Sequence, residues 1–442
     1  MAEAADLPRV ADEALDALVE VLDLVRFGTA TTRPELIRHS GLGRTVVVQR
    51  VGQLIESGLL SEGKHAPSTG GRPARVLTFR AEAGSILAVE LGATSLAVGI
   101  ADLTGRLTSS YEEPCDIAAG PEAVLGRAEQ LLDDLLAARP AGEPPVWGAG
   151  IGLPGPVEYA YGRPIAPPIM PGWDGYPVRD RLSRRYDVPV WVDNDVNLMA
   201  LGELRLGLAR GERDVIYVKI GTGIGAGLIS GGRMHRGAQG AAGDVGHIAV
   251  VDDASVTCRC GNTGCLEAVA GGAALGGLAT AAATDGRSPF LAKRLAEAGF
   301  GPLEAKDLGA AAMHGDAFAV EIFGRTGRHV GGMLATMVNF YNPSLVIIGG
   351  GVASVGDLLL ASIRETVYRR SLPLATRDLR IARSPLADRA GLHGAAFAVI
   401  DELFSRQRLP LWISHGSPAR NPKIAEDVTS AAEALRGSLA SA

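Results

Sequence analysis

A short segment from Gly243 to Glu267 constrains the fold of this chain more than any other feature of its sequence. It reads GDVGHIAV and then CRCGNTGCLE, so three of the four cysteines lie here with a histidine just upstream. Thiolate sulfur and neutral imidazole nitrogen suit a closed, tetrahedral, structural zinc site. Glycines 261 and 264 let so short a loop fold back around one ion. The segment therefore predicts Zn²⁺ held by His247, Cys258, Cys260 and Cys265.

A disulfide is the competing interpretation of these cysteines. Three clustered cysteines leave one unpaired, and nothing marks the chain as secreted. The N-terminal sequence MAEAADLP is acidic, and no uninterrupted apolar run reaches the length of a membrane span. At 442 residues, with 47% hydrophobic and 21% charged residues, the chain is typical of a soluble protein with two or three cores. We expect a cytoplasmic protein with no membrane partner.

The same segment resembles the motif of the ROK family, which groups sugar-responsive repressors with sugar kinases in the actin-like ATPase superfamily. In that family the motif histidine both binds zinc and faces the sugar, and two acidic residues contact sugar hydroxyls. The resemblance implies that His247 has both roles and that Asp244 and Glu267 are sugar contacts. The family usually has glutamate where this chain has Asp244, a departure that bears on the choice of sugar.

Charge is distributed unevenly along the chain. Residues 1–25 carry one arginine and seven acids, whereas residues 26–80 carry nine lysines or arginines and three acids. The whole chain has a formal net charge of −6. A basic island in an acidic protein indicates a local polyanionic partner.

The basic island predicts a winged helix-turn-helix domain. The sequence Thr32-Arg33-Pro34-Glu35 is typical of a capping box with proline in the first turn, and the helix ends at Ser40-Gly41. A second helix is expected from about Arg44 to Ser57, with Val47, Val51, Leu54 and Ile55 on its inner side. The outward Thr45 and Gln49 are candidates for base contacts, and Arg44 and Arg50 for phosphate contacts.

A β-hairpin wing is expected to follow from Gly58, with residues 63–73 as its tip. Gly70, Gly71 and Arg72 are candidate DNA contacts, because a glycine-rich tip can carry an arginine into a narrow minor groove. Helix-turn-helix segments also mediate protein contacts, but capping, spacing, turn and wing together favour DNA. ROK repressors carry such a domain ahead of their sugar-binding part. Two-fold symmetry of a self-associated protein, a dimer or tetramer, would require double-stranded operator DNA with an inverted repeat.

Beyond Phe79 the pattern becomes α/β and resembles the nucleotide cleft of actin-like kinases. Two apolar strands are expected at residues 86–94 and 96–102, and two glycine-rich turns follow the strands 215–220 and 345–348. The resemblance implies nucleotide contacts, if retained, at Glu90, Gly92, Thr94, Gly221, Thr222, Gly223, Gly225, Gly349, Gly350 and Gly351. Glu90 stands where the kinases usually have a magnesium-binding aspartate, and the extra methylene changes metal placement.

The strand 190–193 ends in a segment similar to the family's N-D-x-N motif. By that resemblance Asp195 is the general base of a sugar kinase and Asn194 a sugar contact, whereas Asp193 is expected to be a strand-end carboxylate. The turn Gly152-Leu153-Pro154-Gly155-Pro156-Val157 resembles the one that closes over the sugar, which implies a contact at Gly155.

These features predict a winged helix-turn-helix domain over residues 1–80, a two-lobed actin-like (ribonuclease H-like) ROK domain over 84–405 and an extension over 409–442, with an alanine-rich helix from Ile424 to Leu439. Two functions fit. The first is a sugar-responsive transcriptional regulator, a repressor of carbohydrate genes. The second is a glucokinase-like enzyme that uses ATP and Mg²⁺, with or without DNA binding. Glu90 favours the regulator, because phosphoryl transfer depends on metal position.

Overall fold

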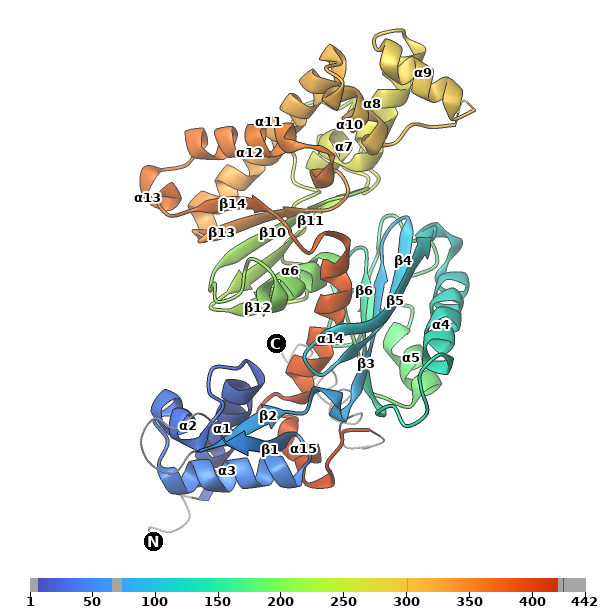
Figure 1. Cartoon of the computed structure of the whole chain (residues 1–442). Helices are drawn as coiled ribbons and strands as arrows, with labels where there is room; N and C mark the ends of the chain where they lie inside the picture. The colour runs from blue at the N-terminus through green and yellow to red at the C-terminus, as the bar shows by residue number, and fades with distance from the viewer. Residues whose placement is uncertain (1–6, 66–73, 300, 420–423, 425–442) are drawn as a thin grey trace, which may run out of the picture.

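The computed structural model describes residues 7–65, 74–299, 301–419 and 424. These residues form a small N-terminal domain below two α/β lobes (Figure 1). Within those ranges, no helix is both long enough and apolar enough to span a lipid bilayer.

The N-terminal domain is a three-helix unit with a two-stranded wing. Its elements are α1 (Leu7–Arg26), α2 (Arg33–Ser40), α3 (Arg44–Glu56), β1 (Leu60–His65) and β2 (Arg75–Phe79). Thr32 and Glu35 form the predicted capping box, and Gly41 ends α2 in the left-handed conformation. Helix α1, which the sequence analysis did not identify, packs on α2, α3 and β2. Its Val21 and Leu22 are fully buried in the core.

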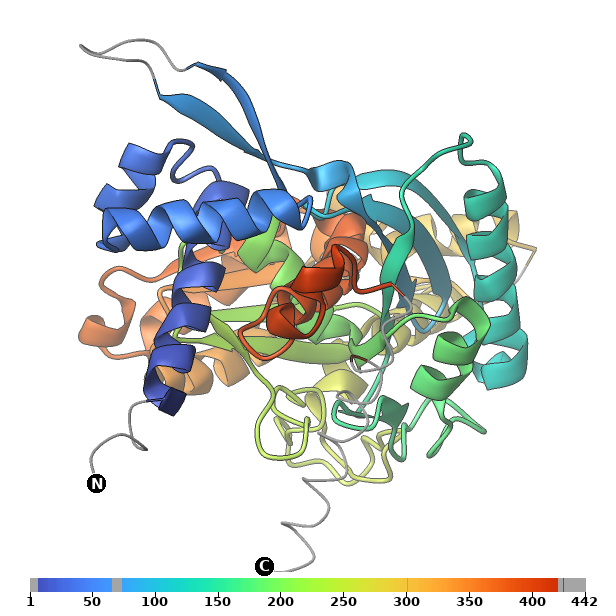
Figure 2. The same ribbon diagram turned by 90° about the horizontal axis from the view of Figure 1, so that it is seen from below.

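The wing differs from its prediction at one point. Residues 63–65 were expected in the tip but belong to β1, because His65 still pairs with Arg75 across the antiparallel ladder. The remaining tip residues, including Gly70, Gly71 and Arg72, lie outside the described residues. Seen from below, the wing strands extend beyond α3 and away from the lobes (Figure 2).

Each lobe contains a five-stranded sheet, and the two sheets have the same topology. The strand orders are β5-β4-β3-β6-β9 in the first lobe and β12-β11-β10-β13-β14 in the second. In both, the first two pairings are antiparallel and the last two are parallel. This repeat is the predicted actin-like architecture. The strands are β3 (Ser85–Leu91), β4 (Ser95–Asp102), β5 (Leu107–Pro114), β6 (Val146–Leu153), β9 (Val190–Asn194), β10 (Val215–Ile220), β11 (Ile224–Ser230), β12 (Arg233–His235), β13 (Leu345–Gly349) and β14 (Arg380–Arg383), with a small hairpin of β7 (Val157–Glu158) and β8 (Arg163–Pro164).

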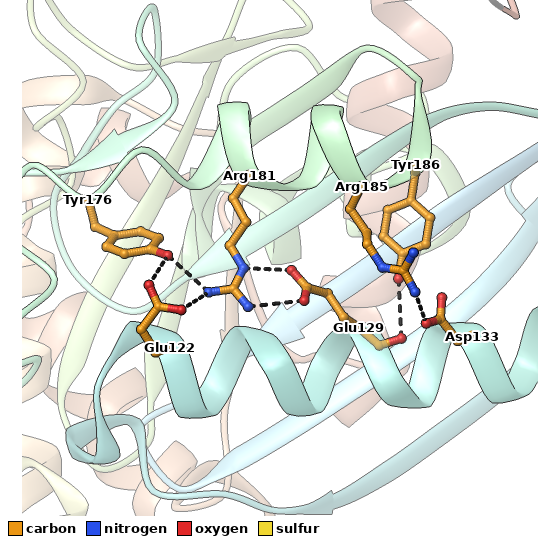
Figure 3. Close-up of polar contacts among 7 residues, drawn as sticks. All are labelled: Glu122, Glu129, Asp133, Tyr176, Arg181, Arg185 and Tyr186. Carbon is orange, nitrogen blue, oxygen red and sulfur yellow. Dashed lines mark hydrogen bonds and ion pairs between the residues drawn. The ribbon is translucent and has the colours of Figure 1, made fainter.

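Helices α4 (Pro121–Ala137) and α5 (Val178–Tyr186) pack against the first sheet and against each other (Figure 1). Polar contacts join the two helices (Figure 3). Arg181 donates to both carboxylate oxygens of Glu129, at 2.6 and 3.0 Å, and to Glu122 at 2.7 Å. A bidentate pair of this kind fixes the orientation of both side chains. It therefore fixes the position of α5 along α4.

The remaining helices cover the second lobe or lie between the lobes. Those of the second lobe are α7 (Leu266–Ala270), α8 (Gly272–Thr284), α9 (Pro289–Glu297), α10 (Ala305–Met313), α11 (Ala317–Tyr341), α12 (Asp357–Arg370) and α13 (Pro373–Thr376). Helices α6 (Asp195–Leu206) and α14 (Ala390–Leu403) pack together between the sheets, and α14 runs from the lobes down to the N-terminal domain (Figure 1).

The first described residues of the C-terminal extension complete the core between the N-terminal domain and the first lobe. Helix α15 (Leu409–Trp412) ends in a fully buried tryptophan. The Trp412 ring meets Trp147 edge-on, with centroids 5.2 Å apart, and also contacts Phe404. Phe404 in turn meets Phe79 of β2. The helix predicted from Ile424 to Leu439 lies outside the described residues except for Ile424, which is buried.

Candidate functional site

A cleft of about 870 Å³ lies where the carboxyl ends of β3, β6, β9 and β10 converge. It brings together every residue predicted to contact sugar, namely Gly155, Asn194, Asp195, Asp244, His247 and Glu267. The residues predicted to contact nucleotide also line it, namely Glu90, Gly92, Thr94, Gly221, Thr222, Gly223, Gly225, Gly350 and Gly351. Gly349 is the exception. A Cβ there would lie 1.9 Å from the Tyr217 hydroxyl, so this glycine serves packing beneath the cleft.

Asn194 and Asp195 stand at the start of α6. The Asn194 side-chain oxygen accepts from the backbone N–H groups of Val196 (2.9 Å) and Asn197 (3.3 Å), which caps the helix. Its amide nitrogen donates to the Gly155 carbonyl at 2.8 Å and so ties down the predicted sugar-closing turn. One amide hydrogen of Asn194 remains for a ligand, since a primary amide has two donors. Asn194 can therefore act toward a sugar as a donor.

The histidine and three cysteines converge on one point. Their ligand atoms all lie within 4.8 Å of one another. The Cys258 sulfur is 3.6 Å from Nδ1 of His247, and the Cys260 and Cys265 sulfurs are 3.8 Å apart. Two thiolates bound tetrahedrally to one Zn²⁺ would be separated by about 3.8 Å. The cluster can hold a metal ion, and its spacing fits zinc.

The same cluster positions the acidic residues on this side of the cleft. Nε2 of His247 lies 4.0 Å from a carboxylate oxygen of Asp244. Cys265 immediately precedes α7, whose first turn carries Glu267, and Glu267 accepts a hydrogen bond from the backbone of Ile224 at 3.1 Å. A metal bound to His247 and Cys265 would thus restrict the positions of the neighbouring Asp244 and Glu267.

Lys219, a residue that the sequence analysis missed, lies in the cleft between two carboxyl groups. Its ammonium is 2.6 Å from Oδ2 of Asp195. Burial by itself lowers the pKa of Lys219, but the Asp195 and Glu90 carboxyls outweigh it and raise that pKa. Lysine is rarely buried without a partner, so a lysine within the apolar strand 215–220 was the signal that could have identified this pair.

Glu90 and Asp195 are both buried, but of the two it is Asp195 that contacts the Lys219 ammonium directly. Burial raises the pKa of Glu90 to about 8, against the opposing charge of Lys219. One of its oxygens, Oε2, has no hydrogen-bond partner among the described residues. The cleft therefore holds the Asp195–Lys219 ion pair beside a Glu90 carboxyl that burial makes harder to ionise.

These charges do not fit a bound Mg²⁺ ion. Magnesium takes an octahedron of oxygens and is usually held by one or two ionised carboxylates. Burial makes Glu90 harder to ionise, and Lys219 already places a positive charge against Asp195. The glycine turns remain compatible with phosphate, whereas the carboxylate of Asp195 is already paired with the protein's own cation.

The raised pKa of Glu90 predicts a specific pH dependence of stability. Between about pH 4.5 and 8 the unfolded chain is ionised at Glu90 and the folded protein is protonated, so stability falls as pH rises through this range. We expect Glu90→Gln, which stays neutral, to raise the melting temperature over the wild type at pH 8 but hardly at pH 5. An equal difference in melting temperature between variant and wild type at both pH values would contradict a raised pKa of Glu90 in the folded protein.

A second surface with functional potential is the exposed side of α3. Arg44, Thr45 and Gln49 are exposed there, whereas Val47, Val51 and Leu54 are buried, as the helical spacing predicted. Arg50 is half-buried and donates to Gln53 at 2.7 Å.

Comparisons with known proteins place the chain among both regulators and kinases. The ROK family model matches residues 86–402. A xylose repressor from Caldicellulosiruptor bescii is 28% identical over 385 residues, which cover 87% of this chain and 95% of that protein.

Two solved structures differ in how far they extend along the chain. A ROK family transcriptional regulator, a homologue of the E. coli Mlc protein, covers 91% of this chain and 100% of its own, with a TM-score of 0.78 and 25% identity. A ROK family glucokinase from Streptomyces griseus in complex with glucose and AMPPNP is 33% identical with a TM-score of 0.62, but it covers 71% of this chain and 99% of its own. The regulators therefore match a larger part of this chain than the kinase does.

Proposed function

The chain belongs to the ROK family, and on that premise we propose that it is a transcriptional regulator that binds operator DNA and responds to a sugar bound in the cleft. The observation that carries the proposal is the Asp195–Lys219 ion pair next to the buried Glu90 carboxyl, in a chain that also has a winged helix-turn-helix domain. A receptor needs the cleft only to hold a sugar, whereas a kinase also needs a free base and a metal position.

The sugar is proposed to lie on the side of the cleft that faces α6 and the metal cluster. Asp195 retains acceptor capacity, since among the described residues Oδ2 accepts from Lys219 and Oδ1 from the backbone of Val196, and each carboxylate oxygen can accept more than one hydrogen bond. Asn194 adds a donor, and Asp244 and Glu267 add acceptors. His247 is proposed to touch the sugar with Nε2 while Nδ1 faces the metal. A mixed set of donors and acceptors suits a polyhydroxylated ligand, because each hydroxyl group can both donate and accept a hydrogen bond.

We propose that the metal is zinc and that its role is structural. The four protein ligands complete a tetrahedral site and leave no open position for catalysis. Zinc would then act by fixing the positions of His247 and Glu267.

DNA binding is proposed for the exposed side of α3, with Thr45 and Gln49 at bases and Arg44 and Arg50 at phosphates. Gly70, Gly71 and Arg72 of the wing tip are proposed minor-groove contacts from the sequence alone. A symmetric dimer or tetramer would read an inverted repeat. The extent of the match to a xylose repressor and to a ROK regulator supports this assignment, because the glucokinase match is about 70 to 90 residues shorter than they are, on the order of one such domain.

An ATP-dependent sugar kinase is the second candidate. The glucokinase match and the glycine turns at residues 221–225 and 350–351 support it. A proton accepted by Asp195 from a sugar hydroxyl, however, would neutralise this carboxylate and leave the Lys219 ammonium without its counter-ion, which is costly.

The test begins with selection of duplexes from a random DNA library, followed by operator titration with and without a sugar. The sugar comes from a thermal-shift panel of D-glucose, D-xylose, D-mannose, N-acetyl-D-glucosamine and their phosphate esters, each with and without ATP and Mg²⁺. We expect an inverted-repeat operator, an affinity for that operator that depends on sugar, and a sugar-induced rise in melting temperature that does not need ATP.

Gln49→Ala should relax the preference for one base pair per half-site by about 1–3 kcal/mol. The control Lys293→Ala, at an exposed position of α9, should leave that preference unchanged.

Two results would reject the regulator. One is operator affinity that stays constant at saturating sugar. The other is rapid ATP-dependent phosphorylation of a panel sugar that Asp195→Asn abolishes, which would establish the kinase instead.

A further inference from the structure

An ion cluster lies where the N-terminal domain meets the lobes. Arg205, in the last turn of α6, donates to Oδ2 of Asp401 on α14 at 2.9 and 2.7 Å. Arg26, the last residue of α1, is only 6% exposed and faces the other oxygen of Asp401 at 3.7 Å. It also donates to Asp23 of its own helix at 3.0 Å. Three helices from both sides of the junction therefore meet at one carboxylate.

The contact across the junction is incomplete. A distance of 3.7 Å is too long for a hydrogen bond. Among the described residues, Oδ1 of Asp401 and the Nε and Nη1 groups of Arg26 are buried and have no hydrogen-bond partner. The Arg26 guanidinium instead lies over the rings of Phe27 (4.4 Å) and Phe404 (5.2 Å). A relative shift of under one ångström would convert this contact into a hydrogen-bonded ion pair.

Both helices that hold the Asp401–Arg205 pair begin in the cleft. Helix α6 starts at Asp195, and its 12 residues span about 18 Å. Helix α14 starts beside Glu90, because a Cβ at Gly391 would lie 2.1 Å from the Glu90 carboxyl carbon. The last turns of the two helices reach the junction, and α14 can be followed from the lobes to the N-terminal domain in Figure 1.

The two helices are in direct backbone contact at two points, both in the first turns of α14. A Cβ at Gly202 of α6 would lie 2.2 Å from the Ala390 carbonyl oxygen. A Cβ at Gly394 of α14 would lie 1.7 Å from the Leu198 carbonyl oxygen. Close-packed backbones of this kind shift together, since neither has room to move into the other.

We propose that α6 and α14 act as one lever between the cleft and the N-terminal domain, and that Arg26 switches between Asp23 and Asp401 as the lever moves. The inference rests on the proposed sugar response. A ligand that contacts Asp195 at the first turn of α6 displaces the helix pair by a fraction of an ångström. At the junction this shift decides whether Arg26 pairs within α1 or across to α14. Packed interfaces with two discrete pairings turn such small shifts into a change of domain position. Arg26, Arg205 and Asp401 are thus positioning residues for the DNA-binding surface.

The experiment compares full-length wild type with Asp401→Asn, Arg205→Ala and the control Arg127→Ala. Arg127 makes a similar two-point contact with Glu113 on the outer side of the first lobe, away from both helices. The measured quantity is the ratio of operator Kd with and without the panel sugar that gives the largest thermal shift. Sugar affinity is measured separately by titration calorimetry, so that loss of binding is not mistaken for loss of coupling.

We expect a wild-type ratio of about 5- to 150-fold, in the range of coupled sites, and ratios within about twofold of unity for Asp401→Asn and Arg205→Ala. Their sugar affinity should be unchanged, and Arg127→Ala should behave as wild type. A merely structural role would alter stability and leave the ratio intact, and that outcome overturns the lever while the proposed function stands. A wild-type ratio of one overturns the proposed function and the lever with it.

Discussion

Cys260→Ser is expected to remove zinc from the protein and to weaken sugar binding by at least 10- to 100-fold. Cys260 is only partly buried, so serine itself costs little packing, and the effect reports on the metal. Without the ion, His247 and the loop that carries Asp244 lose their anchor, and so does Cys265, which precedes the helix of Glu267. Removing a group that merely orients a metal ligand typically lowers metal affinity or activity 10- to 100-fold. Removing the ligand itself is expected to have a larger effect.

Metal content by mass spectrometry and sugar affinity by calorimetry check this expectation. Wild-type protein purified without added zinc should contain close to one equivalent. Cys115→Ser is the matched control, because this cysteine lies far from the cluster in sequence and belongs to the first lobe. A Cys260→Ser protein that kept both its zinc and its sugar affinity would refute the structural metal site.

Trp412→Ala is expected to lower the free energy of unfolding by about 3–5 kcal/mol, which is typical when a large buried aromatic is truncated. Trp412 is fully buried, packs on Trp147 and Phe404, and donates from its indole nitrogen to the Leu403 carbonyl at 2.9 Å. The loss would open a cavity between the N-terminal domain and the first lobe, so both should unfold more easily.

Urea denaturation followed by tryptophan fluorescence and circular dichroism measures the effect. Leu374→Ala is the control, because Leu374 is 74% exposed and its truncation leaves no cavity. A Trp412→Ala protein as stable as this control would mean that the C-terminal extension adds nothing to the junction.

The local features of this chain were readable from its sequence because they depend on neighbours a few residues apart. The capping box at Thr32 and Glu35, the left-handed Gly41 and the buried side of α3 follow from helical periodicity and backbone conformation. The metal cluster was also predictable, since three of its four ligands lie within eight residues and only a few residue types bind zinc.

The cleft was predictable only in part. The motifs named most of the residues that line it, because family resemblance carries tertiary information that one sequence does not contain. The same resemblance placed Gly349 in the cleft, whereas the packing of Tyr217 keeps it beneath the surface. It also missed Lys219, because no rule of local sequence pairs a strand residue with Asp195, which lies 24 positions earlier.

By itself, then, the sequence determined most of the elements, the four residues of the His/Cys cluster and the types of residue that line the cleft. Only the tertiary structure decided the burial that raises the pKa of Glu90, the pairing of Lys219, the place of Trp412 and the meeting of Arg26 with Asp401. Burial and electrostatic interaction depend on distances in space, and the chain sets those distances only when both sheets and the helices between them have packed.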